Sequence, residues 1–81
     1  MEKKEVEARV RKVAAAVLEV DPKIVTTQSN FVLDLGADSR QSVELVAAFE
    51  EEFDIEMDEA QALAVQTIGD AVDFIAAIAN A

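Results

Sequence analysis

Apolar residues recur at helical spacing in three segments of this chain. In residues 3–18 valine or leucine returns every three or four positions, and residues 39–53 and 68–79 repeat the pattern. This spacing places apolar side chains on one face of an α-helix, so each segment predicts an amphipathic helix that contributes to a shared core. The residues expected on the inner faces are Val6, Val10, Val13, Val17 and Leu18, then Ser42, Leu45, Val46, Phe49 and Phe53, and finally Ile68, Ala71, Val72, Phe74, Ile75, Ile78 and Ala79.

Polar residues with capping chemistry mark where helices begin. Asp38 is followed three residues later by Gln41, which is a variant of the capping box. Asp58 and Thr67 stand at the same spacing from a following polar residue. Asp58 therefore predicts a short helix that ends near residue 63 or 64, and Thr67 predicts the start of the last helix.

A long connection joins the first two helical segments over residues 19–38, which is unusual for a helical bundle. Pro22 predicts that the first helix ends near Val20, and Gly36 can adopt a positive φ just ahead of the next helix. The apolar residues of the connection indicate that it packs against the bundle; they are Ile24, Val25, Phe31, Val32 and Leu35. No segment carries a strand signal. The predicted fold is therefore all-α, a small four-helix bundle of three main helices and a short third helix, with a long loop after helix 1.

Length and composition narrow the classes of function. The chain has 81 residues, so we expect a single domain over 1–81. It contains no cysteine and no histidine. Disulfides, thiolate metal sites and histidine-based catalytic triads are thereby excluded. Composition does not exclude an enzyme that uses two carboxylates, although a chain of this length does not easily form a deep pocket.

Charge is distributed unevenly along the chain. Residues 1–29 hold six bases and five acids, a balance of +1, whereas residues 30–81 hold one base and twelve acids, a balance of -11. The second part should repel nucleic acid and anionic membranes and suit a basic protein partner. Simple solubilisation of a small domain is the alternative. Because no apolar run is long enough for a membrane span or a signal peptide, we expect a cytoplasmic protein without membrane insertion. We also expect a monomer.

Ser39 is the residue whose chemistry is most open. It stands at a helix start, where backbone N–H groups and the helix dipole favour an anion. As a nucleophile it lacks a histidine or a nearby lysine to activate it. The neighbouring acids Asp34 and Asp38 do not match the spacing of a calcium-binding loop, so no dedicated metal site is expected. Ser39 is then either an acceptor for a phosphate ester or an ordinary first-turn serine, and the residues alone favour the ordinary serine.

The segment that ends at Ser39 changes that balance. Asp34-Leu35-Gly36-Ala37-Asp38-Ser39 resembles the attachment motif of acyl carrier proteins, and the resemblance extends over nearly the whole chain. Its flanks are Phe31, Val43-Glu44-Leu45-Val46, Phe49-Glu50-Glu51-Glu52-Phe53, Thr67-Ile68 and Asp73-Phe74-Ile75. The resemblance implies that Ser39 carries 4'-phosphopantetheine, transferred from coenzyme A by a phosphopantetheinyl transferase. The protein would then be a carrier that holds acyl groups as thioesters, and not an enzyme.

The resemblance also implies roles for other residues. Asp38 would help the transferase to position its metal ion. Residues expected to line a pocket for the acyl chain are Phe31, Leu45, Phe49, Met57, Ala62, Val65, Ala71 and Phe74. The acids expected to meet basic patches on synthases, reductases and acyltransferases are Glu44, Glu50, Glu51, Glu56 and Glu59. Arg40 is also expected at the partner surface, and the helical pattern itself places Val43 and Ala47 on a small apolar flank beside these acids, where they could form a docking strip.

Several positions depart from the family pattern. Arg40 stands where leucine is usual and is expected either to pair with Glu44 one turn on or to meet an acidic patch on a partner. The other departures are Gln41 for a frequent acid, Asp58 for a common proline, and Leu63 and Ala64 for residues that are typically charged. They favour a specialised lipid or polyketide pathway over general fatty-acid biosynthesis. The alternatives are an unmodified acidic interaction module of the same fold, or an aminoacyl or peptidyl carrier, against which the acidity and the Gly-Ala-Asp-Ser segment argue.

Overall fold

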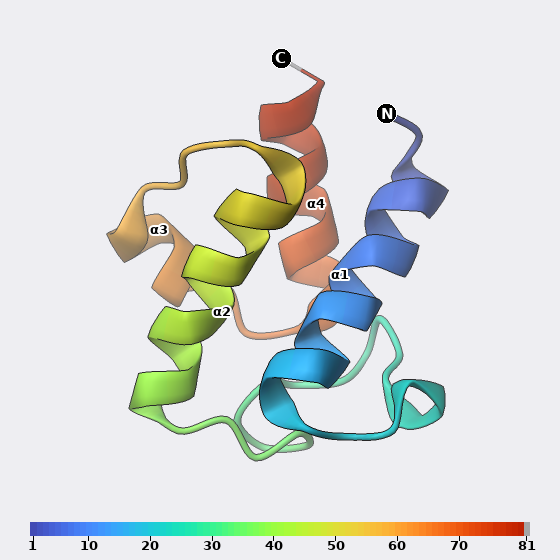
Figure 1. Ribbon diagram of the computed structural model, residues 1–81, viewed down its shortest axis with the longest axis vertical. Helices are drawn as coiled ribbons and strands as arrows, with labels where there is room; N and C mark the ends of the chain where they lie inside the picture. The colour runs from blue at the N-terminus through green and yellow to red at the C-terminus, as the bar shows by residue number, and fades with distance from the viewer. Residues whose placement is uncertain (81) are drawn as a thin grey trace.

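The computed structural model describes residues 1–80 and shows four α-helices (Figure 1). Residue 81, the last of the expected domain, lies outside the described residues. The elements are α1 (Lys3–Leu18), a 3-10 turn η1 (Pro22–Ile24), α2 (Ser39–Phe53), α3 (Glu59–Leu63) and α4 (Ile68–Ala79). α1 packs against both α2 and α4, whereas α3 lies against α2. The predicted all-α bundle with a short third helix and a long first loop is confirmed.

The helix boundaries follow the capping chemistry of the sequence. The carboxylate of Asp38 accepts the N–H of Gln41 at 2.8 Å, and the side-chain oxygen of Gln41 accepts the N–H of Asp38 at 3.2 Å, so the predicted capping box is complete. Asp58 and Thr67 cap α3 and α4 in the same manner. α1 ends at Leu18, two residues before Val20, because the next residue adopts a left-handed conformation.

The core is centred where α1 meets α2 and α4. Val6 and Val10 are fully buried, as predicted, but Val13 and Val17 are only half-buried. Val13 and Val17 still pack against the edge of the core, and α1 also buries Ala14 and Ala15, which the apolar period does not single out. Five further residues predicted on inner faces are half-buried as well: Ser42, Val46, Phe74, Ile78 and Ala79.

The long connection folds onto the start of α4. Carbonyl oxygens of Thr27 and Ser29 accept the first N–H groups of α4, from Gly69 at 2.8 Å and from Ile68 at 3.0 Å. These N–H groups have no partner within their own helix, so the connection completes the helix start. Gly69 permits the contact, since a Cβ there would lie 3.0 Å from the Thr27 carbonyl oxygen.

Burial within the connection divides its apolar residues. Val25, Phe31 and Leu35 are buried as predicted. The prediction is wrong for Ile24 and Val32, which are 58% and 56% exposed. A loop has no regular period that turns every apolar side chain inward, so backbone hydrogen bonding decides which ones face the core.

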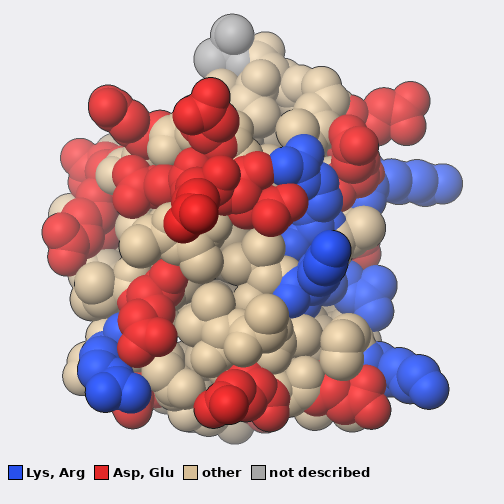
Figure 2. All heavy atoms as spheres, viewed as in Figure 1, with Lys and Arg blue, Asp and Glu red and all other residues tan. Residues whose placement is uncertain are grey.

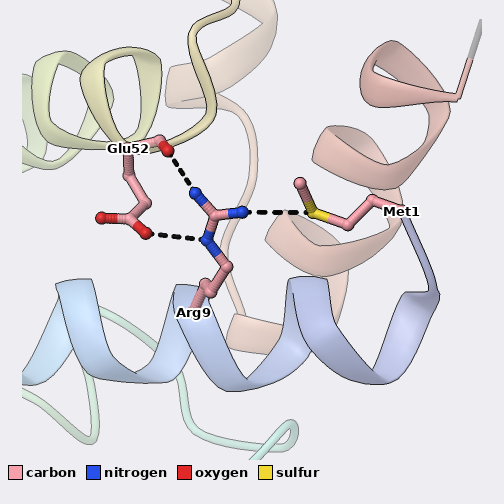
Figure 3. A network of polar contacts seen from close by, with 3 residues as sticks. All are labelled: Met1, Arg9 and Glu52. Atoms are coloured by element: carbon pink, nitrogen blue, oxygen red, sulfur yellow. Dashed lines mark hydrogen bonds and ion pairs between the residues drawn. The ribbon is translucent and has the colours of Figure 1, made fainter.

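Arg9 links α1 to the end of α2 (Figure 3). Its Nε donates to a carboxylate oxygen of Glu52 at 2.7 Å and its Nη2 donates to the Glu52 carbonyl oxygen. The guanidinium also lies 4.6 Å from the ring centre of Phe53 and contacts the sulfur of Met1. A cation is favourable at this place because carbonyl groups at a helix C-terminus lack intrahelical partners.

The end of the bundle that holds the chain's N-terminus carries a second, exposed ion pair. Lys3 pairs with Asp73 of α4, and the hydrogen bond between them raises the pKa of the Lys3 amine above its usual value. No helix within residues 1–80 is both long enough and apolar enough to cross a membrane.

Candidate functional site

Ser39 is the first residue of α2 and is exposed. The N-cap of this helix is Asp38, whose carboxylate already serves the N–H of Gln41. The helix start is therefore capped by Asp38 and does not need the hydroxyl of Ser39 as an acceptor. Since α2 runs for 15 residues, its N-terminus places a partial positive charge next to that hydroxyl. The structure thus presents a serine that is accessible and that suits a phosphate ester.

The turn that precedes Ser39 is fixed by Asn30. The side-chain oxygen of Asn30 accepts the N–H groups of Val32 and Leu33, both at 2.9 Å. The carboxylate of Asp34 in turn accepts the N–H of Asn30 at 2.7 Å. Asp34, the first acid of the attachment motif, thereby holds the turn closed.

Two backbone contacts fix the motif to the rest of the bundle. The N–H of Phe31 donates to the Gln66 carbonyl oxygen at 2.9 Å, just before α4, and the N–H of Ala37 donates to the Phe31 carbonyl oxygen at 2.8 Å. Gly36 has a φ of +74°, the positive value predicted for it. Ser39 therefore follows a segment whose path is set by hydrogen bonds on both sides of Phe31.

A cavity of about 340 Å³ opens between this turn, α2, α3 and the start of α4. Phe31 and Phe49 meet edge to face in its wall, with ring centres 6.5 Å apart. Ser42, one helical turn after Ser39, also lines the cavity. The lining residues are Asn30, Phe31, Val32, Leu33, Ser42, Leu45, Val46, Phe49, Met57, Ala62, Leu63, Val65, Gln66 and Ala71.

Seven of the eight residues predicted for an acyl pocket line this cavity, and whether it receives an acyl chain stays a prediction. The exception is Phe74, which is half-buried elsewhere on α4. Sequence reasoning missed Ser42 and Val46, although both share the α2 face of Leu45 and Phe49, which was the available signal. The other missed residues lie in loops or at the end of α3 and carry no periodic signal; they are Asn30, Val32, Leu33, Leu63 and Gln66.

The residues predicted to meet partners are exposed with one exception. Glu50 is half-buried, and its carboxylate accepts the N–H of Met57 at 3.0 Å, so it ties the segment after α2 back to that helix. The predicted ion pair between Arg40 and Glu44 is present at 3.2 Å. The exposed residues of this set are Arg40, Val43, Glu44, Ala47, Glu51, Glu56 and Glu59.

Charge is distributed unevenly over the face drawn in Figure 2. On the face viewed, carboxylates gather over the end of α2 and the segment that follows it, whereas lysine and arginine side chains gather over α1. The acidic surface therefore includes part of α2, the helix that starts with Ser39. Within residues 1–80, no group of three or more acidic side chains is arranged to hold a metal ion.

Comparison with known proteins decides the family. A family model described as a phosphopantetheine attachment site matches residues 8–75, which is most of the chain. The chain is 57% identical over 67 residues to the acyl carrier protein of Caulobacter vibrioides (strain NA1000 / CB15N), covering 83% of this chain and 86% of that protein. The chain belongs to the acyl carrier protein family. It is also 57% identical to the acyl carrier protein of Phenylobacterium zucineum (strain HLK1), covering 83% of this chain and 85% of that protein.

Membership of the family confirms several predictions. The prosthetic group of this carrier is 4'-phosphopantetheine, and the protein is a carrier and not an enzyme. Its partners include a phosphopantetheinyl transferase and biosynthetic enzymes.

The double role of Asp38 as helix cap and as acid of the motif leads to a testable prediction. We expect Asp38→Ala to lower the free energy of unfolding by about 1 kcal/mol, because the N–H of Gln41 loses its acceptor. Asp38→Asn should stay within about 0.5 kcal/mol of the wild type, since asparagine caps equally well. Urea unfolding of the three proteins measures this. Equal losses in both variants would mean that the charge of Asp38, and not the cap, stabilises α2.

Proposed function

We propose that this carrier holds acyl groups as thioesters on an arm attached to Ser39 and moves them between enzymes in the cytoplasm. The observation that supports this most is the placement of Ser39. Its hydroxyl is exposed and is not needed as a cap, it stands at the positive end of α2, and an apolar cavity begins one turn away.

The residues around Ser39 fit the prosthetic group. The group is joined to serine through a phosphodiester, which carries a negative charge, and the N-terminus of α2 stabilises a negative charge. When bound, it supplies a thiol, which the chain itself lacks because it has no cysteine. Asp38 is proposed to help the transferase to position its metal ion, as the family resemblance implies.

The cavity suits the apolar part of the cargo. Its floor consists of buried apolar side chains, including Leu45, Phe49 and Ala62. Each methylene that moves from water into such a space contributes about 0.8 kcal/mol. A few methylenes therefore hold a chain without trapping it, which suits a carrier that has to release what it holds.

The exposed acids of α2 and of the segment after it are the proposed docking surface. Individually such surface charges are worth little. Together they steer a basic partner into fast and reversible encounters. The partners proposed on this basis are the transferase and the synthases, reductases and acyltransferases that build acyl chains.

Arg40 supports a specialised pathway within this function. Its guanidinium is exposed directly after Ser39 and pairs with Glu44, so it places a cation on the docking surface and offsets one of the acids there. Arg40 is also the one base in residues 30–81. A partner whose surface is complementary to an apolar side chain at position 40 and to an unpaired Glu44 carboxylate would bind this carrier less tightly. We therefore propose cargo of a specialised lipid or polyketide pathway, with general fatty-acid biosynthesis as the alternative.

Modification of Ser39 is tested by intact mass. Incubation of the apo protein with coenzyme A and a broadly active phosphopantetheinyl transferase should add the mass of one phosphopantetheine. Ser39→Ala should gain none. Ser42→Ala is the matched control, because it removes a hydroxyl one turn later and should still be modified. An unmodified wild-type protein, or a modified Ser39→Ala variant, would refute the proposal and leave an unmodified interaction module of the same fold.

The influence of Arg40 on partner choice is tested by kinetics. With a general fatty-acid synthase enzyme and the loaded carrier as substrate, Arg40→Leu should raise kcat/KM by about tenfold, the effect of one well-placed interface contact worth roughly 1.4 kcal/mol. Arg40→Lys keeps the positive charge and should stay close to the wild type. An unchanged rate for Arg40→Leu would show that Arg40 does not set partner choice.

A further inference from the structure

A second hollow of the molecule lies along a different face of α2. It is an open groove of about 510 Å³ between α1 and α2, and it shares no lining residue with the cavity beside Ser39. Its lining residues are Arg9, Val13, Ala16, Val17, Ala48, Glu51 and Glu52. An acyl chain in the cavity would therefore leave this groove open.

The floor of the groove is apolar surface of α1 that the bundle covers only in part. Val13 and Val17 pack against the edge of the core but are half-buried. Ala16, which lies between them in the sequence, is exposed, and Ala48 of α2 is half-buried. The apolar stripe of α1 is thus wider than the surface that α2 and α4 bury.

The shape of the groove suits a helix. Ala16 on α1 and Ala48 on α2 are small, so a third helix can approach both walls closely. Val13 and Val17 stand one turn apart on α1 and offer two successive apolar positions. Side chains that are likewise one turn apart on a bound amphipathic helix match this spacing.

Charge at the groove specifies the polar edge of such a helix. Arg9 and Glu52 line the groove but neutralise each other in their ion pair. Glu51 lines it from α2, is exposed and forms no ion pair within residues 1–80. A lysine or arginine beside the apolar stripe of the bound helix would meet this carboxylate. In Figure 2, uncharged surface indeed borders the carboxylates over the end of α2.

A second copy of this chain fits the groove less well than a different protein. Each copy has a net charge of -10, so two copies repel each other. In a two-fold contact the same patch meets itself. Such a contact supplies no base for Glu51, because the base among the lining residues, Arg9, is already paired with Glu52.

We propose that the groove between α1 and α2 is a second docking site, which binds an amphipathic helix of a partner protein whose apolar stripe is bordered by lysine or arginine. The groove contains neither Ser39 nor any residue of the cavity wall. A partner bound there holds the carrier through α1 and leaves the attachment site accessible. The proposal does not require an arm on Ser39, so it is independent of the proposed function.

Binding of two synthetic peptides to the carrier tests this site, with fluorescence anisotropy as the measurement. The first peptide spans about five helical turns and has leucine at every third or fourth position, with lysines along one edge of that stripe. The second has the same composition in an order without a stripe, so the general attraction of lysine to an acidic protein is equal for both. The striped peptide should bind about tenfold more tightly.

Substitution of Ala16 locates the binding. Ala16→Gln should weaken binding of the striped peptide by about tenfold, because a longer polar side chain fills the groove. Ala8→Gln is the matched control, since Ala8 is exposed on the same helix but does not line the groove, and binding should be unchanged. Glutamine is a good helix former, so both variants should keep the fold, which thermal unfolding verifies. If Ala16→Gln unfolds more readily, Glu51→Gln takes its place and should also weaken binding.

Several results would overturn the proposal. These are no binding of the striped peptide, equal binding of both peptides, or equal affinity of Ala16→Gln and the wild type. A loss in Ala47→Gln without a loss in Ala16→Gln would assign the peptide to the apolar flank beside the acids of α2. A wild-type dimer in sedimentation that Ala16→Gln dissociates would make a second copy the occupant. None of these results affects the mass test of Ser39, so the proposed function would stand.

Discussion

The contact between the long loop and the start of α4 is the interaction on which the rest of this structure depends. The loop supplies carbonyl oxygens to the first N–H groups of α4. Phe31 in the same loop donates its own N–H to the carbonyl oxygen of Gln66, just before that helix. These hydrogen bonds stabilise both segments. They pair N–H groups at the start of α4 that have no acceptor within the helix, and they fix the path of the loop. That path leads directly to Asp38 and Ser39. A loop free of α4 would leave Ser39 without a defined place beside the cavity.

The cavity follows from a second feature, the shortness of α3. A helix of five residues has little stability of its own, so its position is set by tertiary contacts. One such contact is the bond between Glu50 and the N–H of Met57, which anchors the approach to α3 on α2. Small side chains then face the space between the elements, since Ala62 and Ala71 both line it. If the cavity receives cargo, as proposed, a short helix whose position depends on such contacts would help it to admit cargo and release it.

Much of this was available in the sequence. The main helices were predicted by the period of their apolar residues, and their starts by Asp38, Asp58 and Thr67, because capping is a local interaction between residues close in sequence. The ion pair between Arg40 and Glu44 was predicted for the same reason. Seven of the cavity residues are predicted by the family resemblance and not by the apolar pattern.

The rest depends on contacts between distant residues. The outward orientation of Ile24, Val32 and Leu33 is set by loop hydrogen bonds that no spacing encodes. The bond from Glu50 to Met57 gives an acid expected at the docking surface a structural role as well, and nothing in its local sequence distinguishes it from Glu51. Burial of Ala14 and Ala15 likewise reflects the two helices that α1 contacts and not its own periodicity.

The central claim is that an arm on Ser39 delivers an acyl chain into this particular cavity, and photo-crosslinking tests it most directly. The carrier is loaded with an acyl group that bears a diazirine at its methyl end, irradiated, digested and analysed by mass spectrometry. Labels should fall on the floor of the cavity, at Leu45, Phe49 or Ala71. Labels on α1, on the exposed Val43, or on solvent alone would show that the chain lies elsewhere and would contradict the claim.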